Sequence, residues 1–390
     1  MDDGSVREIS AGLSQSGVRD HNERLLLSLI QRHGGLPASD LSKRAGLSPP
    51  TVSTILRRLE GEGLVERGQP VRGKVGKPST PMMLAADGAF AFGLKIGRRS
   101  AELVLVDFVG DMRDARTITY DLPDPDTILS FAEQGIAEIQ AALSSQQASR
   151  VCGLGVGAAF ELWHWPETGG VGRAELEAWR SINIREVLLS RTGLPVSLLN
   201  DATAACQAEH TYGRGREFQD YAYFFIGAYI GGGIVLDNAV YEGRQGNAGA
   251  LGSLPSLGPN GESMQLLEMA SIRQLEARLT EVDLDSRVLW NDPDSWTDLR
   301  RYVAPWLRQT AQELSKAALA VCAVIDFEAI IIDGAFPDHI RSDLVEQVRR
   351  YVSTQDTRGL IAPRIEAGTI GQKARAIGAG TRPLGTQFLL

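Results

Sequence analysis

The chain has 390 residues, which is too long for one average domain and predicts two or three. Its 43% hydrophobic and 23% charged residues are typical of a soluble globular protein. No apolar run is long enough to cross a bilayer, and the first residues lack the basic and apolar regions of a signal peptide, so we expect a cytoplasmic protein that does not bind a membrane.

Charge is distributed unevenly along the chain. The overall charge is −8, yet residues 21–80 contain ten lysines and arginines against five acidic residues. A small basic segment joined to a large acidic body is typical of a DNA-binding module attached to a different kind of domain. A solvated charged face would give the same asymmetry, so the charge distribution alone does not identify a DNA-binding module. The three widely spaced cysteines, each in an apolar context, are expected to be reduced and buried.

The basic segment predicts a helix-turn-helix. Apolar residues at helical spacing indicate helices over 22–32, 38–45 and 50–61. Gly46 provides the turn, and Ser48 is a good N-cap for the third helix. That helix buries its apolar residues and leaves hydroxyl and arginine side chains that suit a major groove. We therefore predict DNA contacts from Ser48, Thr51, Ser53, Thr54, Arg57 and Arg58.

A basic hairpin follows the third helix. Residues 64–67 and 81–84 are predicted as paired strands, and the stretch between them is rich in glycine and basic residues. Such a tip is typical of a wing that contacts phosphates or enters the minor groove, through Arg72, Lys74 and Lys77. A flexible linker that happens to be basic is the alternative.

The rest of the chain contains a duplicated unit. A strand, a glycine turn and a second strand occur twice, over 92–96 and 101–107 and again over 221–226 and 234–237. In both copies the glycine that closes the first strand precedes the aspartate that ends the second by ten residues. Further buried strands are predicted over 151–156, 195–199 and 329–333, and a long helix over 299–324. Duplication predicts two similar α/β lobes with a ligand cleft between them.

A polar pair, Asn200-Asp201, follows the buried strand over 195–199. At the carboxyl end of a buried strand, such a pair usually faces a ligand cleft. A simple Asx turn or helix cap would place the same residues there, and position alone does not separate these interpretations.

With these residues in place, the chain resembles the ROK family, which groups sugar kinases with sugar-responsive repressors that carry a winged helix-turn-helix. The resemblance extends over nearly the whole chain from His21. It is carried by His21-Asn22, Gly46-Leu47-Ser48-Pro49, Glu62-Gly63-Leu64-Val65, Gly76-Lys77-Pro78-Ser79, Gly153-Leu154-Gly155-Val156, Leu199-Asn200-Asp201-Ala202 and Gly246-Asn247-Ala248-Gly249.

The resemblance implies a winged helix-turn-helix followed by a two-lobed actin/hexokinase-like (ribonuclease H-like) α/β body. The expected parts are a mobile segment over 1–20, a DNA-binding domain over 21–84, a first lobe over 85–198 that also includes about 368–390, and a second lobe over 199–367 with the dimer interface and effector cleft. The implied partners are a palindromic operator DNA, a second copy of the chain in a homodimer or tetramer, and a sugar.

The nucleotide motifs of the family's kinases are altered here. The phosphate turn Asp-x-Gly-Gly-Thr reads Lys95-Ile96-Gly97-Arg98-Arg99, and the second lobe's Gly-Thr-Gly reads Gly227-Ala228-Tyr229. The later Gly-Gly pair reads Asp333-Gly334. Because glycine-turn amides form a phosphate cradle, bulky residues there remove it. We therefore expect no ATP binding and no enzyme.

The sugar motif has also changed. Ala-Gly-Glu-x-Gly-His reads Ala248-Gly249-Ala250-Leu251-Gly252-Ser253, and no cysteine lies between Cys206 and Cys322. The family's structural zinc is therefore predicted to be absent. Asp201 matches the kinases' catalytic base and would here only bind sugar hydroxyls. The predicted effector residues are Asn200, Asp201, Asn247, Ser253 and Glu268, with a helix-surface role as the alternative for Glu268.

Three functions remain open at this point. The first is a repressor relieved by a sugar or sugar derivative other than plain glucose. The second is a sugar kinase with an added DNA-binding segment. The third is a regulator whose cleft binds no small molecule.

Overall fold

A computed structural model describes residues 15–70, 79–159, 173–258, 260–291 and 295–390. The chain divides into two compact units, one of Met1–Gly88 with Gly385–Leu390 and one of Ala89–Leu384. Within the described residues, no helix combines the length and the apolar character that a membrane span needs.

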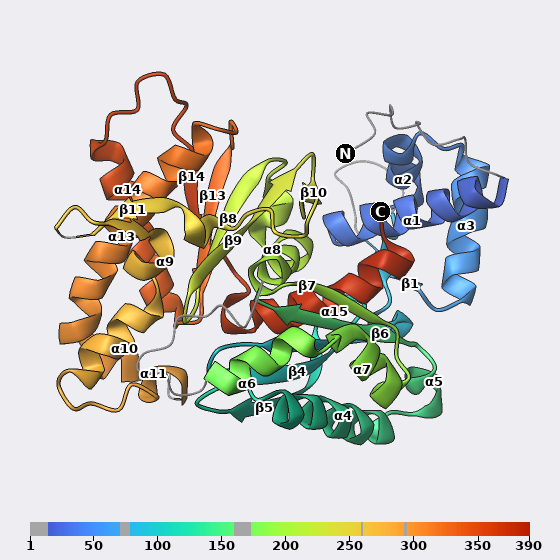
Figure 1. Cartoon of the computed structure of the whole chain (residues 1–390). Helices are drawn as coiled ribbons and strands as arrows, with labels where there is room; N and C mark the ends of the chain where they lie inside the picture. The colour runs from blue at the N-terminus through green and yellow to red at the C-terminus, as the bar shows by residue number, and fades with distance from the viewer. Residues whose placement is uncertain (1–14, 71–78, 160–172, 259, 292–294) are drawn as a thin grey trace, which may run out of the picture. The chain divides into compact units, whose positions relative to one another are not determined.

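The first unit is a three-helix domain with a small antiparallel sheet (Figure 1). Its helices are α1 (Gln15–His33), α2 (Ala38–Ala45) and α3 (Pro49–Gly61), and strand β1 (Val65–Arg67) pairs with β2 (Met82–Leu84). Apolar side chains from all three helices form its core: Leu26, Leu27, Ile30, Leu41, Val52, Leu56 and Leu59. The predicted helix-turn-helix is thus confirmed.

Helix α1 begins earlier than predicted, at Gln15 rather than Asn22. Residues 15–20, expected to be mobile, are helical, although Ser16-Gly17 is a turn signal. Residues 1–14 lie outside the described part. The same holds for residues 71–78, and so for the predicted wing residues Arg72, Lys74 and Lys77.

The C-terminus belongs to this first unit. Arg24 Nε of α1 donates to the carbonyl oxygen of Leu389 at 2.7 Å, and the amide of Leu390 donates to Ser28 Oγ at 2.9 Å. The end of helix α15 (Ala374–Phe388) is therefore fixed against α1.

The second unit contains two five-stranded sheets with the same strand arrangement. The first has the order β5-β4-β3-β6-β7 and the second β10-β9-β8-β13-β14. In each sheet the first three strands of this order pair antiparallel, and the last two are added in parallel. The strands are β3 (Phe90–Ile96), β4 (Ser100–Asp107), β5 (Met112–Thr119), β6 (Val151–Ala158), β7 (Val196–Asn200), β8 (Tyr221–Ile226), β9 (Ile230–Leu236), β10 (Ala239–Val240), β13 (Ala329–Gly334) and β14 (Arg364–Ala367). The predicted duplication into α/β lobes is confirmed.

Strand β9 begins at Ile230, whereas the sequence predicted a turn up to Gly233. The glycines belong to the strand, since Gly232 pairs with Phe224 of β8. A Cβ on Gly231 would lie 2.7 Å from Cβ of Ala202, so their role is to let helix α8 (Asp201–Tyr212) pack closely on the strand.

Helices cover both sheets. Helices α4 (Pro125–Ala142) and α7 (Ile184–Thr192) pack on one face of the first sheet, and α15 lies on the other (Figure 1). The second lobe adds α10 (Ile272–Thr280), α13 (Arg300–Cys322) and α14 (Asp338–Thr354). Short elements complete the unit: α5 (Ser145–Ala148), α6 (Arg173–Ala178), α9 (Leu266–Met269), α11 (Val288–Asn291), α12 (Ser295–Asp298), β11 (Pro255–Leu257) and β12 (Ser263–Gln265).

The three cysteines are free thiols. Burial raises the pKa of Cys152 to about 12 and that of Cys322 to about 11, so both thiols are neutral at pH 7. Cys206 and Cys322 are buried, as predicted, whereas Cys152 is only half-buried.

Candidate functional site

Helix α3 presents a polar face in the position of a recognition helix. Ser48 caps it, because its hydroxyl accepts the amide N–H of Thr51 at 3.4 Å, and Pro49 occupies the first turn. The predicted DNA-contacting side chains on α3 and its cap are all exposed: Ser48, Thr51, Ser53, Thr54, Arg57 and Arg58. The predicted DNA-contacting residues that the structure describes are therefore all accessible to solvent on α3 and its N-cap.

The two arginines of this face differ in their partners. Arg58 forms ion pairs with Glu23 at 2.8 Å and with Glu62 at 2.9 Å. Arg57 forms no ion pair with any described residue. Since two carboxylates already neutralise Arg58, Arg57 is the better placed of the two for a phosphate or a base.

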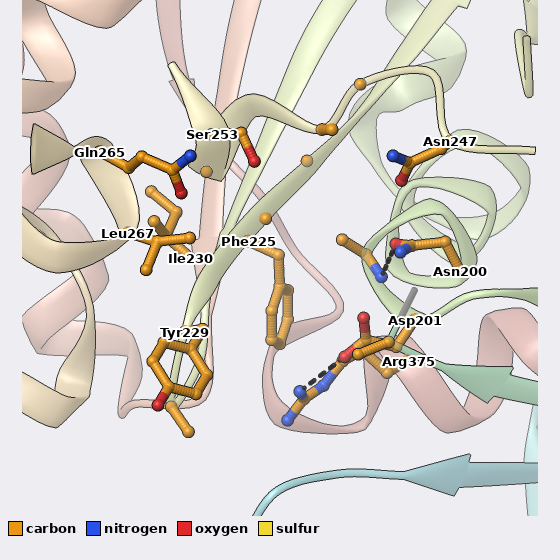
Figure 2. Close-up of a pocket in the computed structure, with 18 of the residues that line it drawn as sticks. Asn200, Asp201, Phe225, Tyr229, Ile230, Asn247, Ser253, Gln265, Leu267 and Arg375 are labelled. Carbon is orange, nitrogen blue, oxygen red and sulfur yellow. Dashed lines mark hydrogen bonds and ion pairs between the residues drawn. The ribbon is translucent and has the colours of Figure 1, made fainter. Parts of the chain in front are cut away.

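The second unit contains a cavity of about 510 Å³, lined by residues from both lobes. All five predicted effector residues line it, although they come from separate segments of the sequence: Asn200, Asp201, Asn247, Ser253 and Glu268. Figure 2 shows Asn200 and Asp201 on one side and Ser253 on the other. The volume lies in the range that holds small-molecule ligands.

Asn200 and Asp201 stand where β7 passes into α8. The Asn200 side-chain oxygen caps the helix by accepting the amide N–H groups of Ala202 at 2.9 Å and Thr203 at 3.3 Å. The helix-cap interpretation is therefore correct for this oxygen, and the side-chain N–H groups of Asn200 are what it offers the cavity. Asp201 Oδ2 accepts from Arg375 Nη1 at 3.1 Å.

A loop held tightly against β9 forms another part of the wall. Gly249 has φ +75°, and a Cβ there would lie 2.7 Å from Cα of Gly233. Only glycine allows both that backbone conformation and that approach. The close packing places Asn247 and Ser253 at the cavity.

Glu268 lies at the cavity on the short helix α9. Its Oε2 accepts the backbone N–H of Gln265 at 2.8 Å in a capping box, and the side chain is exposed. Both interpretations of Glu268 thus have support, because it is a helix-surface cap that also lines the cavity.

Sequence reasoning missed several lining side chains, among them Phe225, Gln265 and Arg375. Arg375 lies in the first turn of α15, and its Cζ is 4.9 Å from the Phe225 ring centroid. Its one sequence signal is an isolated arginine among small and apolar residues. A charged residue on such a helix face needs a partner, and Asp201 supplies it.

Lys95 of β3, at the position of the kinases' acidic residue, is fixed inside the first lobe. Its Nζ donates to Ser100 Oγ at 2.7 Å and to Glu102 Oε1 at 3.0 Å. Burial lowers the pKa of Lys95 to about 8, while Glu102 opposes this shift. The Glu102 carboxylate is shared with Lys373, whose Nζ lies 3.1 Å from Oε2.

Comparison with known families matches both units. The ROK family profile matches residues 91–381, and a profile described as winged helix-turn-helix DNA-binding matches residues 19–66.

Individual relatives agree with these matches. An uncharacterized protein y4fQ from Sinorhizobium fredii is 26% identical over 94% of this chain and 91% of its own length. The xylose repressor of Caldicellulosiruptor bescii is 25% identical over 60% of this chain and 58% of its own length, so less than two thirds of that repressor is aligned.

Two solved structures share the fold. A ROK family transcriptional regulator, described as a homolog of the E. coli MLC protein, has a TM-score of 0.66 at 20% identity, over 95% of this chain and 97% of its own. A ROK family glucokinase from Streptomyces griseus, in complex with glucose and AMPPNP, has a TM-score of 0.59 at 21% identity, over 75% of this chain and 99% of its own. At these identities the likeness concerns the fold.

Proposed function

The chain belongs to the ROK family and carries a winged helix-turn-helix DNA-binding domain, and from this we propose that it is a transcriptional repressor whose operator affinity is lowered by a sugar or sugar derivative. The observation that carries the proposal is the joining, in one chain, of an exposed α3 face to a cavity that gathers Asn200, Asp201 and Asn247. These side chains provide donors and acceptors of the kind that sugar hydroxyls require.

Three arrangements support a cleft that does not transfer phosphate. Lys95 stands where the phosphate turn of the family's kinases has an aspartate, and it forms an ion pair with Glu102. The Asp201 carboxylate, which would act as base, is already paired with Arg375.

At the third altered nucleotide motif, Asp333-Gly334, the aspartate side chain is engaged in bonds within the protein. Asp333, fully buried, forms an ion pair with Arg341 at 2.7 Å and accepts the amide N–H of Gly371 at 2.9 Å. These bonds join β13 to the turn before α15, which gives Asp333 a structural role.

We further propose that two copies of the chain pair and present two α3 helices to a palindromic operator. In that arrangement the half-sites would be about one helical turn apart, ~34 Å, or a multiple of it. A tetramer would use the same half-site geometry twice. No cofactor, ATP or structural zinc enters this mechanism.

A gel-shift titration tests the proposal, with purified chain and the DNA upstream of its own gene, in the presence and absence of a panel of sugars. We expect salt-sensitive binding that one sugar relieves. Asp201→Asn should bind the same DNA and lose the response to that sugar. ATP-dependent phosphorylation of a sugar would contradict the proposal in favour of a kinase.

The regulator with a silent cleft predicts a different result. Its DNA binding would be insensitive to every sugar, and no sugar would raise the midpoint of thermal unfolding. A bound ligand at about 100 times its Kd would stabilise the chain by ~2.7 kcal/mol, which a thermal-shift measurement detects.

A further inference from the structure

Helix α15 belongs to both units of the chain. The division between the units falls between Leu384 and Gly385, inside the helix. The chain passes from one unit to the other at one further point, between Gly88 and Ala89. The 15 residues of α15 span about 22 Å, at ~1.5 Å per residue, and successive backbone hydrogen bonds link its two ends. A displacement at one end of α15 is therefore carried toward the other.

Pro383 lies inside α15, just before this division. Proline lacks an N–H and removes one backbone hydrogen bond, yet the helix continues to Phe388. After Pro383, the amide N–H of Leu389 donates to the carbonyl oxygen of Gly385 at 3.0 Å. The helix is therefore continuous through the division.

The part of α15 in the second unit is bonded to two segments that form the effector cavity. Arg375 Nη1 donates to Asp201 Oδ2 at 3.1 Å. Two turns further on, Arg382 forms an ion pair with Glu242. The carbonyl oxygen of Glu242 accepts the amide N–H of Ala248 at 3.0 Å, and Ala248 lines the cavity. Both α8 and this loop therefore reach α15 through an arginine.

Close backbone packing also joins α15 to its neighbours. A Cβ on Gly378 would lie 1.7 Å from the carbonyl oxygen of Ala204 on α8. A Cβ on Gly93 of β3 would lie 2.0 Å from the carbonyl oxygen of Ala376 on α15. No side chain lies between these backbones to absorb a shift. A ligand that moves α8 against the first sheet must therefore act on α15.

The C-terminal end of α15 is held by an arginine of the DNA-binding unit. Arg24 of α1 donates from Nε to the carbonyl oxygen of Leu389 at 2.7 Å and from Nη2 to that of Gly385 at 3.4 Å. The amide of Leu390 donates to Ser28 Oγ at 2.9 Å. The last carbonyl groups of a helix have no partner within it, and a guanidinium both bonds them and complements the negative end of the helix dipole. Arg24 therefore ties α15 to α1, which shares a core with α3.

We propose that α15 carries the effector signal from the cavity to the DNA-binding unit, and that Arg24 passes it on to α1. The inference rests on the proposed function and adds the route of its regulation. With Arg24 bonded, a ligand that acts on the Asp201–Arg375 end of α15 also acts on α1 and the α3 face. Without these bonds, operator affinity no longer follows the cavity. Because coupling between two sites is reciprocal, the operator must also affect the cavity end of α15.

Arg24→Gln in the full chain tests this route. Fluorescence anisotropy measures operator affinity with and without the sugar that relieves binding in the gel shift, and calorimetry measures sugar affinity. In the wild type the sugar should lower operator affinity about 5–150-fold, the usual range of allosteric coupling. Arg24→Gln should still bind the operator and the sugar, while the sugar changes its operator affinity by less than about two-fold.

Further variants separate transmission from local stability. Ser28→Ala removes the acceptor of the Leu390 amide and should lower the sugar response in part. Gly385→Ala is the matched control on α15, because its Cβ would meet no described atom within 4 Å and alanine favours a helix. Its sugar response should equal that of the wild type. Thermal unfolding checks that each variant is folded, and if Arg24→Gln is not, the response of Ser28→Ala decides.

Hydrogen exchange supplies a test that needs no sugar. Operator DNA is added to the wild type and to Arg24→Gln, and amide exchange is followed over residues 374–384, the part of α15 in the second unit. In the wild type we expect the operator to change exchange rates there by about three-fold or more. In Arg24→Gln the operator should leave them unchanged.

The outcomes separate this inference from the proposed function. A full sugar response in folded Arg24→Gln overturns the route through α15 and keeps the repressor. A wild-type chain whose operator affinity no sugar alters contradicts the proposed function, and hydrogen exchange then decides the route alone. A change over residues 374–384 that Arg24→Gln abolishes supports the route, whereas no change, or the same change in both chains, overturns it.

Discussion

The guanidinium of Arg375 lies 3.1 Å from the carboxylate of Asp201, although 174 positions separate them in the sequence. Asp201 is the first residue of α8, and Arg375 lies in the first turn of α15. The ion pair thus fixes two helices at the floor of the cavity, and a ligand that reaches Asp201 also meets Arg375 (Figure 2).

Arg375→Met should destabilise the body by about 2–4 kcal/mol, because it leaves the largely buried Asp201 carboxylate without its cation. The double variant Arg375→Met/Asp201→Asn should recover part of that loss, since no charge is then unpaired. Urea unfolding of the single and double variants measures the coupling. If the two substitutions had additive effects on the free energy of unfolding, the interaction between Arg375 and Asp201 would contribute nothing to stability.

Gly155→Ala tests the contact between β6 and α15. A Cβ on Gly155 would lie 1.7 Å from the Ala379 carbonyl oxygen, which is backbone and cannot rotate away. We expect a loss of about 3 kcal/mol or more. Gly135→Ala on α4 is the control, because its Cβ would meet only side-chain atoms, the nearest being the end of Leu103 at 2.6 Å, and alanine favours a helix. The effect of Gly135→Ala on the midpoint of thermal unfolding should be small. If Gly155→Ala and Gly135→Ala had equal effects, the result would argue against the close packing of α15 on β6.

Local signals in the sequence predicted the DNA-binding helices well. Helix α2 has the predicted bounds, and α3 starts one residue before its predicted start. These predictions were close because Gly46, at φ 63°, and the Ser48 cap are local signals that act within a few residues of the helix ends. Asn200 and Asp201 were predicted to face a cleft from their place after a buried strand. Asn247, Ser253 and Glu268 followed from the resemblance, since only the folded lobes bring them to the same cavity.

Features that depend on distant contacts were missed. The start of β9 was wrong because the Gly231–Gly233 run suggests a turn, whereas its function is to admit α8. Arg375 was missed because its partner Asp201 belongs to another part of the sequence. In both cases tertiary packing, which no window of neighbouring residues reveals, decides the role.

Glu102 should make the body sensitive to acid. Burial alone would raise its pKa, but Lys95, Lys373 and Arg375 together lower it to about 2 from 4.5. Because the folded pKa is below the unfolded one, the ionised group contributes stability that is complete above pH 4.5 and is lost as pH falls toward 2. The contribution is about 3 kcal/mol. Glu102→Gln should flatten this part of the stability–pH curve, measured by thermal unfolding, and an unchanged slope would contradict the assignment.

Arg57 and Arg58 should contribute unequally to operator binding. Arg57→Ala removes an exposed charge without an ion pair among the described residues, so we expect affinity to fall about ten-fold and the salt slope to fall by about 1 if it contacts a phosphate. Arg58→Ala should cost less, because Glu23 and Glu62 already neutralise that guanidinium. Arg180→Ala, an exposed arginine paired with Glu177 on the body, is the control. Fluorescence anisotropy with labelled operator at several salt concentrations compares the three, and a larger loss for Arg58→Ala would mean that DNA displaces its carboxylate partners.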